Sequence, residues 1–267
     1  MADNNNPWFI RWPITAWCDA LAAIEQMPWV FGTALSGVVV LQGLNRFVVP
    51  QAGPTDFGPQ ILHLAINLLQ ALLLTPAAIA VHRFVILQER TSHYRLNVTD
   101  PRTSSFFFCA VAIQALIFVP VMLFPVLLLA LAGFGAGLGL LSSAMLPIFF
   151  LVAWALLTLR TLILFPAIAV DAPGAGWSNA LLDTKGHTLR VLSVVIITSV
   201  PVFAVGWLQL FWLGRAIPSG VAGKVIQIVL SGVTNTVTMA VFAALASRIF
   251  VALANRLAGQ AAETGPA

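Results

Sequence analysis

Uncharged polar side chains recur at helical spacing in two long apolar segments of the sequence. His63, Asn67 and Gln70 follow at intervals of four and three residues, which places them on one helix face. The second segment carries four such residues, Gln227, Ser231, Asn235 and Thr238. These side chains could form a path or pocket for a polar solute or lipid headgroup. They could instead hydrogen bond between helices, at about 1 kcal/mol or less per contact. We favour hydrogen bonding and keep the pocket between the two segments as the alternative.

Two groups of loop residues have the types that serve acid–base catalysis: His93 with Asp100, and Asp171 with Asp183 and His187. Neither group has a nucleophile or a metal-binding triad beside it. Cys18 and Cys109 lie in different predicted elements without metal-ligand spacing, so we expect both to be small apolar fillers. The sequence therefore predicts a protein that is not an enzyme and that holds no metal or cofactor.

The composition indicates what surrounds these side chains. Of 267 residues, 60% are hydrophobic and 8% are charged, whereas soluble domains are about half apolar and about a quarter charged. Mean hydropathy is +0.96. The apolar stretches are long and continuous, unlike the short alternating segments of a β-barrel. Basic residues are spread singly and form no patch for nucleic acid. The sequence predicts an all-α polytopic membrane protein.

Six apolar segments are long enough to cross a bilayer, at about 29–49, 60–87, 106–131, 140–165, 191–213 and 224–253. Between the second and third, residues 88–105 are expected to form a solvated loop. Ahead of the first, Trp8, Trp12 and Trp17 stand among charged residues, which predicts an amphipathic helix at the interface with its tryptophans at headgroup depth. The predicted organisation is an interfacial helix (1–28), a six-span domain (29–258) and a polar tail (259–267).

The basic residues indicate the orientation. Six spans place ten of the thirteen on one side: Arg11, Arg83, Arg90, Arg95, Arg102, Arg160, Lys185, Arg190, Arg248 and Arg256. The other side has only Arg46, Arg215 and Lys224. Because cytoplasmic loops carry an excess of Lys and Arg, we expect both termini in the cytoplasm of a cell with a bacterial-type inner membrane. Every Asp and Glu falls in a loop, a terminus or a span end, which weighs against ion-coupled transport.

The ends of two predicted spans have similar sequences. Residues 82–87 read HRFVIL and residues 247–252 read SRIFVA. Arginines at inner helix ends follow from topology alone, so we treat the similarity as coincidence rather than as internal duplication.

Residues 160–190 read RTLILFPAIAVDAPGAGWSNALLDTKGHTLR. This order of arginine, proline, acid, glycine turn and Lys-Gly step before a span resembles a motif of the six-helix membrane domain that accompanies some bacterial glycerophosphodiester phosphodiesterases, and of similar stand-alone membrane proteins. Those proteins often have an aromatic residue after the basic-Gly step, where this chain has His187 and Thr188. No soluble segment here is long enough for the phosphodiesterase domain, so the enzymatic activity is not carried over.

The same segment suggests contacts at the membrane surface. Arg160 is expected to pair with Asp171 or to reach the interface, and Lys185 and Arg190 to face lipid phosphates. We therefore expect a non-catalytic accessory or scaffold protein that contacts anionic lipid or a membrane-protein partner through Arg160, Asp171, Lys185 and Arg190. The alternative is a transporter or channel for a small or lipidic solute, on the face formed by His63, Asn67, Gln70, Gln227 and Asn235.

Overall fold

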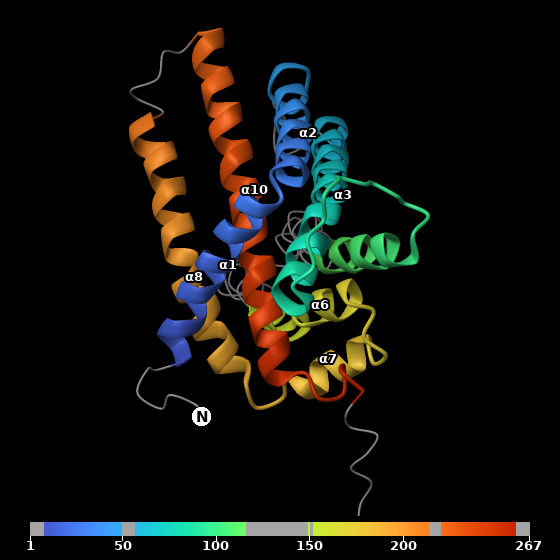
Figure 1. Cartoon of the computed structure of the whole chain (residues 1–267). Helices are drawn as coiled ribbons and strands as arrows, with labels where there is room; N and C mark the ends of the chain where they lie inside the picture. Colours follow the sequence, from blue (N-terminus) through green and yellow to red (C-terminus); the bar gives the residue numbers. More distant parts are fainter. Residues whose placement is uncertain (1–7, 50–56, 116–148, 150–151, 214–219, 260–267) are drawn as a thin grey trace, which may run out of the picture.

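All regular structure in the described part of the chain is helical. The computed structural model describes residues 8–49, 57–115, 149, 152–213 and 220–259. The long helices are α1 (Trp8–Gln26), α2 (Pro28–Phe47), α3 (Phe57–Leu87), α8 (Thr188–Leu208), which continues as π-helix η1 (Gln209–Leu213), and α10 (Val221–Leu253). The short ones are residues 101–115 and 152–161, α6 (Leu164–Ala169) and α7 (Trp177–Asp183). Figure 1 shows α2, α3, α8 and α10 along the long axis of the molecule. The predicted all-α membrane protein is confirmed.

Three predicted spans coincide with helices to within a few residues, and a fourth, 140–165, overlaps one in part. Helices long and apolar enough to cross a membrane are Gly58–Leu87, Val152–Ala169, Thr188–Phe211 and Val221–Leu253. A fifth is counted only if α1 and α2 form one broken span. Most of the predicted 106–131 span and part of the 140–165 span lie outside the described residues. The protein is multi-pass, and the exact count of six stays a prediction.

Helix α1, the predicted interfacial helix, packs on the bundle. The chain bends by 95° between α1 and α2, where Pro28 begins α2. Ala16, Ala20 and Ala23, spaced at four and three residues, are buried in the core cluster that α8 and α10 share. Nε1 of Trp17 donates to the carbonyl of Thr198 in α8 (3.2 Å). The small alanine face lets α1 approach closely, and the headgroup depth of the tryptophans stays a prediction.

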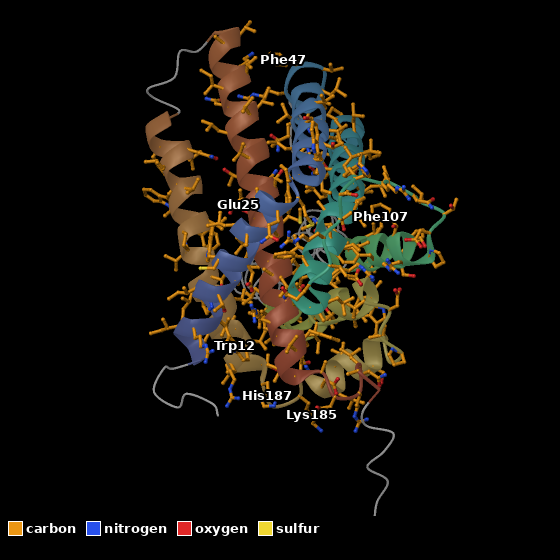
Figure 2. The ribbon with its side chains drawn as sticks, in the orientation of Figure 1. Trp12, Glu25, Phe47, Phe107, Lys185 and His187 are labelled. Carbon is orange, nitrogen blue, oxygen red and sulfur yellow. The ribbon has the colours of Figure 1, made fainter. Side chains whose placement is uncertain are left out.

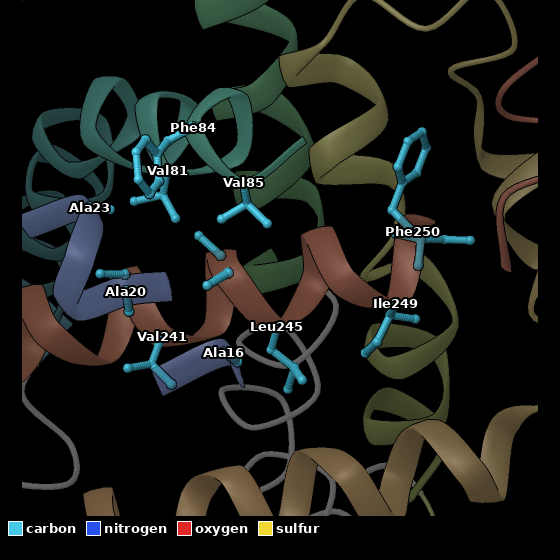
Figure 3. Close-up of a cluster of buried hydrophobic side chains, with 14 of the residues drawn as sticks. Ala16, Ala20, Ala23, Val81, Phe84, Val85, Val241, Leu245, Ile249 and Phe250 are labelled. Atoms are coloured by element: carbon cyan, nitrogen blue, oxygen red, sulfur yellow. The ribbon is translucent and has the colours of Figure 1, made fainter. Parts of the chain in front are cut away.

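The core lies along the second halves of α3 and α10. Figure 3 shows Val81 of α3 and the alanines of α1 gathered against α10. The two similar span ends meet here, because Nδ1 of His82 and Oγ of Ser247 are 2.8 Å apart and both residues are buried. This contact joins the first residues of the HRFVIL and SRIFVA segments and ties α3 to α10.

The loop after α3 folds back along that helix and is only partly the solvated loop that was expected. The hydroxyl of Tyr94 donates to the carbonyl of Leu73 (2.8 Å), and burial raises the pKa of Tyr94. The amide of Thr91 lies 3.4 Å from the sulfur of Met27, at the bend between α1 and α2. Arg90, by contrast, is exposed as predicted.

Candidate functional site

A polar pocket of about 360 Å³ lies between α2, α3 and α10. All five residues of the predicted polar face line it: His63, Asn67, Gln70, Gln227 and Asn235. Ser231, named above with the polar residues of the second segment, also lines it. The structure adds six lining residues, Gln42, Asn45, Arg46, Val49, Lys224 and Ile228. The contribution of α2 was not predicted. Its spacing gave a usable indication, because Gln42, Asn45 and Arg46 fall at intervals of three and one, on one side of a helix.

Close helix packing positions the pocket walls. A Cβ on Gly37 would lie 2.8 Å from Cδ1 of Leu73, so α2 touches α3 at this glycine. A Cβ on Gly232 would lie 2.7 Å from Cγ2 of Val39, so α10 touches α2 at nearly the same level of α2. The α2 residues of the pocket come after Gly37 in the chain, toward Phe47. The three helices are thus held together beside the deep end of the pocket.

The polar side chains of the pocket are mostly not used to join helices. One contact is made: Nδ1 of His63 lies 2.5 Å from Oδ1 of Asn45, and since an amide oxygen only accepts, this nitrogen carries the proton. The other four amides of the predicted face have no hydrogen-bond partner within the described ranges; these are Asn67, Gln70, Gln227 and Asn235. Hydrogen bonding between the described helices, the interpretation that the sequence favoured, therefore does not account for these amides.

A different amide makes the helix-joining contact on another face of α10. Nε2 of Gln209 donates to Oγ1 of Thr234 (2.7 Å), which ties η1 to α10. Thr234 does not line the pocket. Gln209 thus hydrogen bonds between helices, whereas the four amides of the pocket do not do so within the described ranges.

The predicted surface residues of the 160–190 segment serve different purposes. Arg160 does not pair with Asp171: it donates to the carbonyl of Leu181 (2.7 Å), and its own carbonyl accepts from Thr184 (3.2 Å). Arg160 thereby holds α7 against the helix at 152–161. Lys185 and Arg190 are exposed, and their contact with anionic lipid stays a prediction.

Asp171 belongs to an arginine cluster at the end of α3. Its Oδ1 accepts from Nε of Arg102 (3.0 Å), with a second contact between Oδ2 and the same guanidinium. Arg83 lies 3.7 Å away and also pairs with Glu89 (2.6 Å). The hydrogen bond to Asp171 raises the pKa of Arg102, so this cation is charged at all ordinary pH values. The two arginines of the cluster are thus neutralised by the carboxylates of Asp171 and Glu89.

Two of the candidate acid–base carboxylates, Asp183 and Asp100, accept hydrogen bonds that stabilise the local fold. Asp183 accepts from the backbone amides of residues 255–257, at 3.0–3.1 Å, and Asp100 accepts from Oγ1 of Thr103 (3.2 Å). No group of three His, Cys, Asp or Glu side chains within the described ranges could hold a metal ion. The polar pocket is therefore the strongest candidate site.

Comparison of the chain with protein-family models, curated proteins and solved structures gives no match in any of the three. The resemblance of the 160–190 segment thus stays a prediction.

Proposed function

We propose that this chain is a non-catalytic accessory protein of the membrane that binds a polar solute or a lipid headgroup in the pocket between α2, α3 and α10. One observation carries the proposal: four amides from two helices line one pocket without a hydrogen-bond partner in the described chain. Asn67 and Asn235 are exposed and Gln70 and Gln227 are half-buried, so all four amides are accessible to a ligand or water in the pocket. At membrane depth an amide without any partner costs free energy, which such a ligand or water offsets. The volume of about 360 Å³ lies within the usual range of about 300–1,000 Å³ for small-ligand pockets.

The pocket is better suited to binding than to open conduction. Its lining on α10 runs from Lys224 to Asn235, which is about 16 Å of helix. Beyond that level most of the neighbouring side chains of α3 and α10 are apolar and buried, as at Val81, Val241 and Leu245. A solute that entered at Lys224 would meet this packed core, so passage across the membrane would need a rearrangement of α3 and α10.

Replacement of two pocket amides tests the proposal. In the Asn67→Leu/Asn235→Leu variant we expect the ligand that co-purifies in mild detergent to be lost, while thermal stability is equal to or above that of the parent. The reason is that leucine removes hydrogen-bonding groups that the fold itself leaves unpaired. Native mass spectrometry measures the bound ligand, and a thermal scan measures stability.

Gln114→Leu is the matched control, because Gln114 is an exposed amide on the helix at 101–115, away from the pocket. The control should keep the ligand. Equal ligand occupancy in the double variant and the parent would contradict the proposed function.

A further inference from the structure

Two cations line the pocket on the side of the molecule where cations are scarce. Only three of the thirteen basic residues fall on the predicted non-cytoplasmic side. The structure describes two of these, Arg46 and Lys224, and both line the pocket. The positive-inside rule explains the ten basic residues on the other side, but it gives no reason for two on this one.

Neither cation has an acidic partner in the described chain. The ion pairs there join Arg83, Arg102 and Arg248 to carboxylates. These pairs lie near the C-terminal ends of α3 and α10, whereas the pocket lies near the N-terminal ends of both helices. Among the residues that the structure describes, the pocket lining contains no Asp or Glu. In this respect Arg46 and Lys224 differ from the arginine cluster around Asp171, which is already neutralised.

The position of Lys224 is itself unfavourable for a cation. It lies four residues after the N-cap of α10, Gly220, at the positive end of the helix dipole, which stabilises anions instead. Its Nζ lies 5.8 Å from the ring centroid of Phe47, at the end of α2, and Figure 2 labels Phe47 beside the first turns of α10. Lys224 therefore lines the pocket at its exposed side, next to the helix turn that carries Arg46.

We propose that the pocket binds a phosphate-bearing ligand, with the phosphate between Arg46 and Lys224 and a hydroxyl-bearing portion on the amides below. This inference rests on the proposed function and names its ligand class. A guanidinium matches phosphate oxygens with two parallel N–H donors, and an ammonium adds a point charge. Amide side chains both donate and accept, as hydroxyl groups require. The phosphate belongs either to a free phosphate ester or to the headgroup of a lipid.

Binding measurements on the full chain test the ligand class. The protein is placed in nanodiscs of phosphatidylcholine and titrated with glucose 1-phosphate, with inorganic phosphate and with glucose as the uncharged probe. Nanodiscs that contain phosphatidylglycerol supply the lipid arm, read by native mass spectrometry. We expect Arg46→Gln/Lys224→Gln to weaken binding of the phosphate-bearing probe tenfold or more. Lys185→Gln/Arg190→Gln removes the same charge from the opposite side and should change it less than twofold.

The arms separate the two sources of the phosphate. Binding of glucose 1-phosphate in phosphatidylcholine nanodiscs supports a free ester. Retention of phosphatidylglycerol without binding of either soluble phosphate probe supports a lipid headgroup. Single variants Arg46→Gln and Lys224→Gln, each checked by gel filtration for a folded particle, keep the test valid if the double variant does not fold.

Failure of the ligand class and failure of the pocket give different results. If glucose binds as tightly as glucose 1-phosphate and depends on Asn67 and Asn235, the phosphate inference is overturned while the pocket function stands. If phosphate binds through Arg46 and Lys224 with undiminished affinity in Asn67→Leu/Asn235→Leu, the cations bind phosphate without the pocket, and the proposed function fails. If Arg46→Gln/Lys224→Gln binds the phosphate-bearing probe as tightly as the parent does, the inference is overturned.

Discussion

At the scale of single residues, Gly174 shows how the 160–190 segment is used in the fold. A Cβ at this position would lie 2.1 Å from the carbonyl oxygen of Arg256. The amide of Gly174 also donates to the carbonyl of Leu257 (3.2 Å). The backbone amides of residues 255–257 also donate to the carboxylate of Asp183. Together these hydrogen bonds fix the residues after α10 against the turn before α7. The glycine is required for close approach of two backbones.

Gly174→Ala should lower the free energy of unfolding by about 1–3 kcal/mol, because the two backbone segments must move apart to admit the methyl group. Thermal unfolding measures this loss, and hydrogen exchange should show faster exchange at residues 255–257. Gly176→Ala is the control, since the nearest atom to its added Cβ would be 3.8 Å away. Similar losses in both variants would show that the close approach to Arg256 is not what makes Gly174 sensitive.

At the scale of elements, an ion pair connects α1 to the far end of α10. Nε and Nη2 of Arg248 donate to the two carboxylate oxygens of Asp19, at 2.7 and 2.9 Å. The Asp19 side chain is 21% exposed and that of Arg248 is 41% exposed. This two-bond geometry orients α1 across α10, and the alanine face then packs beneath it.

Asp19→Asn should loosen α1 on α10 and cost about 1 kcal/mol, since the pair is partly exposed and its attraction is partly screened. Hydrogen exchange along α1 is the direct measurement, and a double-mutant cycle with Arg248→Gln isolates the coupling. Glu25→Gln, an exposed acid of the same helix without an ion pair in the described chain, is the control. A coupling energy near zero would mean that the alanine packing alone positions α1.

The elements also show which parts of this structure a sequence can predict. Long apolar runs set the limits of α2, α3, α8 and α10 to within a few residues, because helix length must match bilayer thickness. The regular spacing of polar side chains in α3 and α10, four amides and His63, placed five pocket residues on facing helices. The docking of α1 was missed because alanines contribute little to an apolar pattern, although they permit the closest packing. The partner of Arg160 is a backbone carbonyl, which no pattern of side chains reveals.

At the scale of the whole molecule, the distribution of charge assigns opposite sides to the two ends of α8 and α10. Lys185 precedes α8, whereas Lys224 lies at the start of α10. One crossing by α8 separates them. The predicted orientation places Lys185 in the cytoplasm and the pocket mouth outside it.

Cysteine labelling tests this orientation. In a Cys18→Ala/Cys109→Ala background, we expect a membrane-impermeant maleimide to label Lys224→Cys in intact cells and Lys185→Cys only after permeabilisation. Both lysines are exposed, so access depends on the side rather than on burial. Labelling of both cysteines from outside, or of Lys185→Cys alone, would overturn the orientation and the location of the pocket mouth.

The glycine contact of α2 with α3 divides α2 into two parts with different surroundings. Gly37, where α2 touches Leu73, lies near the midpoint of α2. Before it, Val30 and Phe31 are buried in the core, and after it the polar side chains of α2 line the pocket. One helix therefore connects the pocket to the 95° bend with α1, where Met27 meets the loop that follows α3.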